Sequence, residues 1–392
     1  MSFSADDSRI ASPGAIASIG ALNFATVAVY ADLYITQPIL PLLSREFGIP
    51  PATAGLTISV VVLMIALVSS AYGSLSDAVG RKPVMVTSCV LLAVPTLLCA
   101  IASSFHMLLL FRAFQGLLMP GVTAVAVAYI GDYYSEADLG PKVGGWIAAS
   151  VAGGLTGRVL SGILAAGTNW RMPFLFFGFL TLVGAAAIAR GLPSGQGLAG
   201  MRLGSAYRGM LVHFENRRLI GAFVIGGGVF FSFIGIFTYL PYYLTASPFR
   251  LSTALVSSVY LVYIAGVFAS LASGRISRSV GRRPLMAAGL SIACAGVLGT
   301  RIPSLPAIVV SLVVLCIGMF TVQSTAPAFV NANAEGAKGA AGALYVTFYY
   351  VGASLGSVLH GFAWQAWGWP GVTVVCTAAL ALGLLADGLL CG

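Results

Sequence analysis

The sequence predicts an all-α membrane protein with twelve transmembrane helices in two pseudo-symmetric six-helix bundles. Of its 392 residues, 58% are hydrophobic and only 8% are charged, whereas a soluble domain has about 25% charged residues. Many apolar runs are about 20 residues long, which is the length that crosses a bilayer. The two halves of the chain also share repeated segments. A soluble enzyme and a disordered chain are both excluded by this composition.

Twelve apolar segments are expected to be transmembrane helices. They are residues 15–42, 52–72, 84–104, 107–130, 143–166 and 172–191, then 218–243, 252–273, 285–301, 305–328, 341–364 and 370–390. The longest polar stretch separates the sixth from the seventh. We therefore expect an N-terminal bundle over 1–191, a cytoplasmic middle loop over 192–217 and a C-terminal bundle over 218–392.

Basic residues are distributed unevenly between the two sets of connecting segments. With the N-terminus in the cytoplasm, 14 of the 20 Lys and Arg residues fall on the cytoplasmic side, 4 on the other side and 2 within helices. This bias follows the positive-inside rule, so both termini are expected in the cytoplasm. The net charge of +9 therefore reflects topology rather than nucleic-acid binding. We expect a monomeric integral protein of a bacterial inner membrane, and no cleavable signal peptide.

Two pairs of segments show that the halves repeat each other. GSLSDAVGRKP at 73–83 and GRISRSVGRRP at 274–284 share six of eleven residues at an offset of 201. GRVLSG at 157–162 and GSVLHG at 356–361 share four of six at an offset of 199. Such a parallel repeat predicts two bundles that rock about a shared central site.

The segment 73–83 resembles the loop 2–3 signature of the major facilitator superfamily. Gly80 permits a turn conformation that most side chains disfavour. The resemblance implies that Asp77 faces the N-terminus of the eleventh helix, where the helix dipole is positive, and closes the cytoplasmic side in the outward-open state. Arg278 replaces the acid in the second copy, so this lock is predicted to be one-sided. The predicted conformational gate comprises Gly73, Asp77, Gly80, Arg81, Lys82, Gly274, Arg278, Gly281 and Arg282.

The fourth and fifth helices carry two further segments that resemble motifs of this superfamily. RAFQG at 112–116 resembles the R-x-x-Q-G motif of its twelve-helix drug:proton antiporters. GGLTGRVLSG at 153–162 resembles their antiporter motif, with Arg158 at the proline position and Ser161 at a glycine position. The resemblance extends to a bacterial branch of sugar or drug efflux permeases and implies export. Close helix packing is predicted at Gly153, Gly154, Gly157, Gly162, Gly352 and Gly356.

Asp32 is the one acid of eleven that is predicted to lie deep in the membrane. A charge at that depth costs about 3 kcal/mol or more, which makes it a functional candidate. One interpretation is a static ion pair with Arg112 or Arg158. The other is a proton carrier whose interaction with a nearby arginine changes as the cavity opens. Asp32, Arg112 and Arg158 form the predicted proton-coupling group.

Polar and aromatic residues on the central helices are expected to line a substrate cavity, with helix packing or the interfacial aromatic belt as the alternative for each. They are Tyr30, Tyr34, Gln37, Phe114, Gln115, Tyr239, Tyr260, Tyr263, Gln323, Tyr349 and Tyr350. No catalytic residue, metal site or cofactor is expected. The six cysteines lack metal-site spacing, and the G-x-S-x-G pattern at 352–356 lies within an apolar helix rather than a strand–turn–helix elbow.

The sequence therefore predicts a proton-coupled secondary transporter that exports a small amphipathic organic solute, such as a drug, metabolite or sugar-like compound, by alternating access. Its partners are the lipid bilayer, the small-molecule substrate and protons, and no nucleic acid. One deep acid against two deep arginines favours neutral, zwitterionic or anionic solutes over lipophilic cations. Alternatives are a proton-coupled uptake symporter for a sugar or organic acid, an intramembrane enzyme, and a sensor that does not transport.

Overall fold

The computed structural model describes residues 13–193, 212–334 and 338–392, and throughout these ranges the regular elements are helices without a strand. The middle of the predicted loop at 192–217 lies outside the described residues, as do Arg9, Arg202 and Arg208 of the charge count. The first half contains α1 (Pro13–Leu33), η1 (Gln37–Ile39), α2 (Leu40–Phe47), α3 (Pro51–Val79), α4 (Arg81–Cys99), α5 (Phe105–Leu118), α6 (Pro120–Thr123), α7 (Val125–Tyr133), α8 (Glu136–Gly167) and α9 (Met172–Gly191). The second half contains η2 (Val212–Glu215), α11 (Arg217–Thr245), α12 (Thr253–Val259), η3 (Tyr260–Val262), α13 (Tyr263–Val280), α14 (Arg282–Gly299), α15 (Leu305–Asn333) and α16 (Lys338–Leu390).

The described residues account for twelve membrane-crossing helices. Ten helical segments are long and apolar enough to cross a bilayer. The last of these, α16, has 53 residues and contains Gly368 in a non-helical conformation (φ 61°, ψ −147°), so it is two helices joined at a kink. Helix α14 adds a further segment of 18 residues. The predicted all-α, twelve-helix fold is therefore confirmed.

Proline residues interrupt several of the predicted helices. The first predicted helix divides into α1, η1 and α2, with Pro38 in the first turn of η1. The fourth divides into α5, α6 and α7, and Pro120 begins α6. Proline lacks a backbone N–H and clashes with the preceding turn, which explains these breaks. Carbonyl groups that lose their helical partners at such breaks need other donors.

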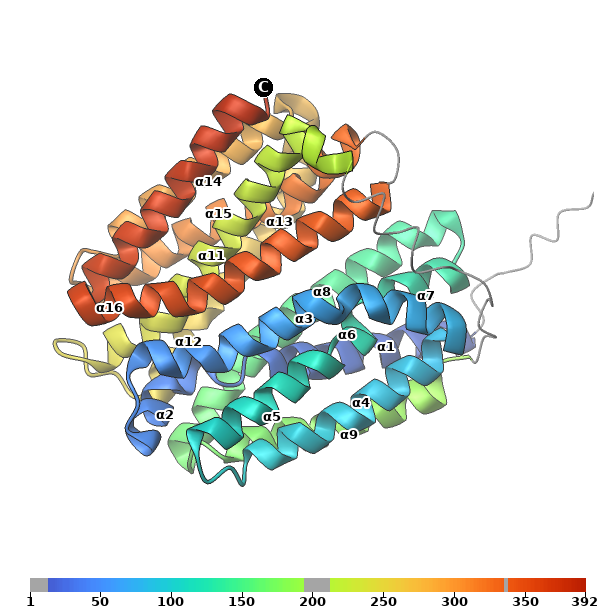
Figure 1. The fold of residues 1–392 in the computed structure, drawn as a ribbon, viewed down its shortest axis with the longest axis horizontal. Coiled ribbons are helices and arrows are strands. Elements are labelled where there is room, and N and C mark those ends of the chain that lie inside the picture. The colour runs from blue at the N-terminus through green and yellow to red at the C-terminus, as the bar shows by residue number, and fades with distance from the viewer. Residues whose placement is uncertain (1–12, 194–211, 335–337) are drawn as a thin grey trace, which may run out of the picture.

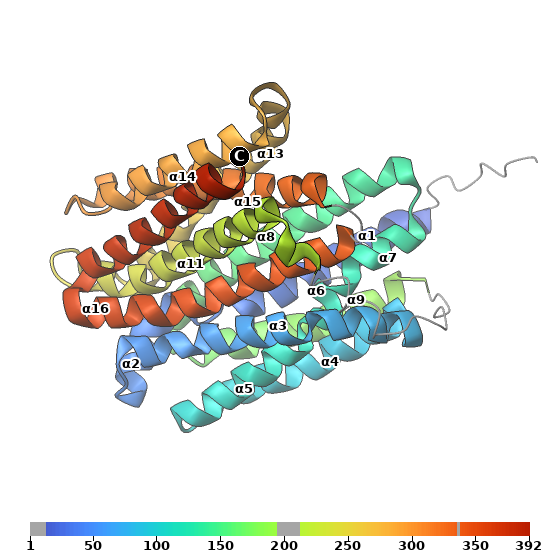
Figure 2. The same ribbon diagram turned by 45° about the horizontal axis from the view of Figure 1, so that its top comes forward.

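Helices α1–α9 lie side by side as one bundle, and α11–α16 form a second bundle (Figure 1, Figure 2). The start of α1, the end of α9, the start of α11 and the C-terminus lie at one end of the molecule, which we call the terminal end. The bundles meet through α3 with α16, α8 with α12, and α11 with η1 and α2. Their ribbons are close together at the left of Figure 1 and diverge toward the terminal end. We call the end where they meet the closed end.

The structure corrects the prediction that 73–83 is a loop. Helix α3 continues to Val79 and α4 begins at Arg81, so Gly80 alone separates two helices, with φ 104°. The second copy repeats this geometry, with Gly281 at φ 86° between α13 and α14. The end of the apolar run marks the boundary of the bilayer. The helix continues past this boundary because the polar residues that follow still form helical backbone hydrogen bonds.

Candidate functional site

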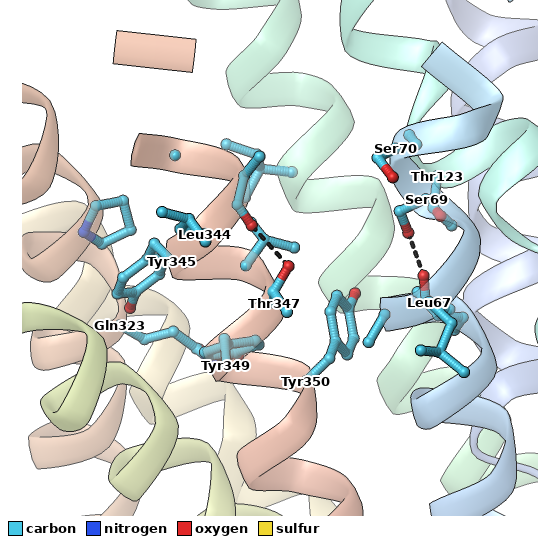
Figure 3. A pocket seen from close by; sticks show the side chains of 18 of the residues that line it. Leu67, Ser69, Ser70, Thr123, Gln323, Leu344, Tyr345, Thr347, Tyr349 and Tyr350 are labelled. Atoms are coloured by element: carbon cyan, nitrogen blue, oxygen red, sulfur yellow. Dashed lines mark hydrogen bonds between the residues drawn. The ribbon is translucent and has the colours of Figure 1, made fainter. Parts of the chain in front are cut away.

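Two adjoining cavities, which we call the wider and the narrower part of one site, lie between the two bundles. The wider part has a volume of about 780 Å³ and the narrower part about 460 Å³. Figure 3 shows the wider part, with Leu67, Ser69 and Ser70 of α3 on one side, Tyr350 of α16 across from them, and Tyr349 beside Gln323. Both parts share lining residues from the two bundles, so they lie next to each other. The residues common to both are Tyr30, Ile147, Gln323, Pro327, Tyr349 and Tyr350.

Six of the predicted cavity residues line this space. Those residues are Tyr30, Tyr34, Tyr263, Gln323, Tyr349 and Tyr350. The Gln323 side-chain amide donates to the hydroxyl of Tyr349, whose ring stacks on Phe230 with centroids 3.7 Å apart. Aromatic surfaces from α1, α11, α13 and α16 therefore enclose the narrower part.

The other five predicted cavity residues line neither part of the cavity. They are Gln37, Phe114, Gln115, Tyr239 and Tyr260. The Tyr239 hydroxyl donates to the Ser357 carbonyl at 2.6 Å, and the Tyr260 hydroxyl donates to the Phe237 carbonyl at 2.8 Å. Phe114 is 48% exposed on the surface of its bundle. Apolar helices carry polar residues on every face, so sequence alone does not fix which face borders the cavity.

Several lining residues escaped the sequence analysis. Trp146 on α8 and Tyr345 on α16 border the wider part, and Phe230, Phe233 and Phe320 border the narrower part. Phenylalanines in an apolar helix carry no signal that separates cavity lining from packing. Trp146 and Tyr345 could have been found, because each lies on a helix that already carried predicted residues.

Asp32 lies on α1 and faces the interior of its own bundle. Its side chain is 0% exposed, whereas Tyr30 and Tyr34 of the same segment line the cavity. Residues two apart on a helix point about 200° apart, which explains the opposite orientation. The Asp32 carboxylate accepts hydrogen bonds from Thr96 Oγ1 at 2.6 Å and from Gln115 Nε2 at 3.2 Å.

No basic side chain in the described part of the chain lies within 4.0 Å of the Asp32 carboxylate. The nearest connection is indirect, because Gln115 donates to Asp32 and its Oε1 accepts from Arg112 Nη1 at 2.8 Å. A direct static ion pair between Asp32 and Arg112 or Arg158 is therefore wrong for this conformation. The carboxylate is held by neutral donors.

Arg112 is fully buried on α5 and binds backbone carbonyls. Its Nη1 donates to the Asp32 carbonyl at 3.1 Å, its Nη2 to the Leu33 carbonyl at 2.7 Å and its Nε to the Thr57 carbonyl at 2.9 Å. Helix α1 ends at Leu33, where carbonyls lose their intrahelical partners. Arg112 therefore caps the break in the first membrane segment, and its positive charge suits the negative end of the helix dipole.

Arg158 on α8 lies at the deep end of the narrower part and is 2% exposed. Its Nε donates to Gln37 Oε1 at 2.5 Å and its Nη1 to the Gly154 carbonyl at 2.8 Å, while its Nη2 has no hydrogen-bond partner. The guanidinium carbon lies 3.6 Å from the ring centroid of Tyr34 and 4.9 Å from that of Tyr263. Among the residues described, Arg158 makes no ion pair.

Hydrogen bonds between the bundles seal the closed end. Gln37 Nε2 donates to Thr238 Oγ1 at 3.1 Å, and the hydroxyls of Ser44 and Tyr242 lie 2.6 Å apart. Nearer the cavity, the Ser59 hydroxyl is bonded to Ser354 at 2.7 Å. The cavity therefore ends at this seal, and its wider part lies toward the terminal end.

Sequence comparison identifies the family. A family model described as Major Facilitator Superfamily matches residues 22–357 and 249–390. The chain belongs to the major facilitator superfamily. It is 34% identical over 367 residues to the inner membrane transport protein YnfM of Escherichia coli K12, covering 93% of this chain and 88% of that protein. It is 31% identical to the uncharacterized MFS-type transporter YybF of Bacillus subtilis, covering 92% and 90%. The protein is therefore a membrane transporter and not an enzyme.

Solved structures of the superfamily share the fold. A bacterial homolog of the human lysosomal transporter Spinster, in an inward-facing and unoccupied conformation, matches with a TM-score of 0.79 at 17% identity, covering 97% of this chain and 95% of that one. A mutant of the nucleoside transporter NupG matches with a TM-score of 0.80 at 12% identity, covering 95% and 98%.

The superfamily's loop 2–3 motif is bonded within the first bundle of this transporter. Arg81 pairs with Asp77 at 2.5 Å and with Asp132 on α7 at 2.9 Å. Lys82 donates to the carbonyl of Leu192 at 2.6 Å. The predicted contact of Asp77 with the start of the eleventh helix is therefore replaced here by a local ion pair. In the second copy, Arg278 is exposed at the corresponding position.

Glycines of the fifth and eleventh membrane helices lie where helices approach closely. A Cβ on Gly153 would meet the carbonyl of Val27, and one on Gly157 would meet that of Ala31, both on α1. A Cβ on Gly162 would collide with Ser257 of the other bundle. Gly352 and Gly356 lie equally close to α11, while Gly154 lies beside Arg158 and Tyr34. Gly73 and Gly274 have open space around them.

Proposed function

We propose that this transporter couples the movement of protons to the export of a small amphipathic organic solute by alternating access. The observation that carries the proposal is Asp32, a fully buried carboxylate in the membrane whose partners are the neutral side chains of Thr96 and Gln115. A buried carboxylate without a paired cation is costly as an anion. Taking up a proton removes that cost, so Asp32 is suited to bind and release one.

The network around Asp32 accommodates both charge states. The Thr96 hydroxyl lies 2.6 Å from the Asp32 carboxylate and 2.8 Å from the Leu92 carbonyl. When Asp32 is ionised, Thr96 donates to it. When Asp32 is protonated, the acid donates to Thr96, which then donates to Leu92. Rotation of one hydroxyl therefore serves both states.

A path of hydrogen bonds and a short stretch of backbone links this network to the closed end. Gln115 bridges Asp32 to Arg112, and Arg112 binds the carbonyls that end α1. The chain then enters η1, where Gln37 bonds to Thr238 of the other bundle. We infer that a change of charge at Asp32 alters the α1–η1 junction and so biases the seal between the bundles.

The bundles over 1–191 and 218–392 are the moving bodies in this proposal, joined by the middle loop at 192–217. The positive-inside bias supports a cytoplasmic terminal end in a bacterial inner membrane, so this conformation is open toward the cytoplasm. Opening the other side requires the hydrogen bonds of the closed end to break. Rocking of two repeats about a central site provides such a motion.

Proteoliposomes with an imposed pH gradient test proton coupling. We expect Asp32→Asn to abolish solute flux driven by the gradient, because the amide binds no proton in this range, while solute exchange without a gradient continues. Asp138→Asn, at an exposed acid, is the matched control and should transport normally. Gradient-driven flux at the wild-type rate in Asp32→Asn would refute the role of Asp32.

Proton-coupled uptake of a sugar or organic acid is the second candidate. It is favoured by one observation, the presence of Arg158 where the antiporter motif has proline. Vesicles of known orientation distinguish the two directions. Export predicts that a proton gradient directed into the cytoplasmic compartment drives solute out of it, whereas uptake predicts that solute accumulates there.

A further inference from the structure

The side chains that line the cavity carry a single formal charge. Among the residues described along its two parts, Arg158 is the only ionised side chain at neutral pH, and no Asp or Glu is present. The Asp32 carboxylate lies outside the cavity lining. The space that faces the solute is therefore electropositive. In a low-dielectric site this charge strongly disfavours a cation and favours an anion.

Four buried hydrogen-bond donors around the cavity have no partner. They are Trp146 Nε1, Arg158 Nη2, Tyr263 Oη and Tyr345 Oη. Leaving a buried polar group without a partner costs about 1–3 kcal/mol. Indole and guanidinium nitrogens only donate, and carboxylate or sulfonate oxygens only accept. The unused donors therefore match an acceptor-rich ligand.

We propose that the solute of this transporter is an aromatic organic anion, and that Arg158 Nη2 binds its acid group; this inference rests on the proposed transport function. The Nε and Nη1 atoms of Arg158 are already bonded to Gln37 and Gly154. One charge-assisted hydrogen bond from Nη2 remains, and Tyr263, whose hydroxyl also has no partner, lines the same part of the cavity.

The remaining walls of the narrower part suit an aromatic ring. Phe230, Phe233, Phe320, Tyr349 and Tyr350 line it, and aromatic rings favour stacked or edge-on contacts with one another. The cavity volumes lie within the range of sites for small organic ligands, roughly 300–1,000 Å³. Arg158 Nη2 is covered in this conformation, and the Tyr34 ring lies over the guanidinium face. Binding therefore requires rotation of a neighbouring tyrosine.

Equilibrium binding to the purified transporter in nanodiscs, without a pH gradient, tests the proposal. The probes are naphthoate, naphthalenemethanol and naphthylmethylamine, which share a ring system and are anionic, neutral and cationic at neutral pH. We expect naphthoate to bind at least about tenfold more tightly than the alcohol, the scale of a charge-assisted hydrogen bond. The amine should bind most weakly. Equal affinity for acid and alcohol, or preference for the amine, would overturn the proposal.

The variant Arg158→Gln tests whether Arg158 causes the preference for naphthoate over naphthalenemethanol. We expect this variant to bind naphthoate and naphthalenemethanol equally, while its affinity for the alcohol stays within about threefold of the wild type, which shows that the site is still formed. Arg158→Lys should restore part of the preference for the acid and keeps the test valid if Arg158→Gln does not fold. Arg171→Gln, at a surface pair with Glu46, is the control. An unchanged acid preference in Arg158→Gln contradicts the proposal.

The binding preference can be tested independently of proton coupling. Binding without a gradient does not require Asp32 to change its charge, so Asp32→Asn should keep the preference for naphthoate. If gradient-driven flux survives in Asp32→Asn, the proposed coupling fails while the charge preference stands. If the preference is absent while Asp32→Asn loses its flux, the coupling stands and the solute class is wrong.

Discussion

Asp32 and Arg158 are both buried charges in the membrane, but their surroundings differ. Asp32 faces the interior of the first bundle and is bonded to Thr96 and Gln115. Arg158 lies at the end of the cavity and retains an N–H without a partner. Burial alone therefore does not define a role. The hydrogen-bond partners define it. Neutral partners around a fully buried acid favour a proton site, whereas a donor without a partner beside a cavity favours a ligand site.

Arg112 and Arg158 offer a second contrast within the same region. Arg112 donates to three backbone carbonyls and to Gln115, whereas Arg158 donates to one carbonyl and to Gln37. The first arginine caps a helix break, and the second lies on the cavity, where we propose that it binds the solute. The sequence gives no means of telling these two arginines apart, and only the geometry separates the helix-capping residue from the proposed binding residue.

The largest expected effect is on stability. Arg112→Gln leaves buried carbonyls without donors and should destabilise the protein by about 3–5 kcal/mol, as expected when a buried charged partner is removed. Thermal unfolding in nanodiscs measures the change, with Arg158→Gln as the matched substitution. We expect a clearly larger fall in Tm for Arg112→Gln. Equal falls would mean that both arginines serve mainly to hold the fold.

An intermediate effect is expected at the seal between the bundles. Thr238→Val removes the acceptor of Gln37 Nε2 while keeping the shape of the side chain. Losing one hydrogen bond of about 1 kcal/mol should raise the population of the conformation in which the bundles separate at the closed end by about fivefold. Spin-label distances across the closed end measure this population. A wild-type distance distribution would show that this bond does not hold the seal.

The smallest expected effect is at Tyr263. Tyr263→Phe keeps the ring against Arg158 but removes the unpartnered hydroxyl. We expect naphthoate to bind about two- to threefold more weakly, which corresponds to the lower end of the range for one hydrogen bond, and naphthalenemethanol to be affected less. The same binding measurement in nanodiscs provides the test. An equal loss for both probes would assign Tyr263 to packing around the ring rather than to the acid group.

Much of the fold follows from the sequence because the bilayer imposes a length on each apolar run. The twelve segments, the repeat and the unusual depth of Asp32 are all visible in composition and spacing. The ends of helices are less visible, because hydropathy reports the boundary of the bilayer. This is why 73–83 looked like a loop, although α3 and α4 are separated there only by Gly80.

The site is harder to predict because helix rotation is not encoded in a uniformly apolar segment. Gln115 lies against Asp32 and Phe114 on the surface, although both were expected at the cavity. The sequence did not identify Thr96 as a partner of Asp32, because threonines in membrane helices commonly bond to their own backbone. Arg158 was identified from its place in a motif, but its free N–H and its contact with Tyr34 emerged only from the packing of α8 against α1.

The most direct test measures binding and gradient-driven flux together in two variants. We expect Asp32→Asn to bind naphthoate like the wild type but to show no flux driven by the pH gradient. We also expect Arg158→Gln to lose the preference for naphthoate over naphthalenemethanol and to keep its affinity for the alcohol. If Asp32→Asn lost binding together with flux while remaining folded, this would contradict the separation of the proton site at Asp32 from the solute site at Arg158.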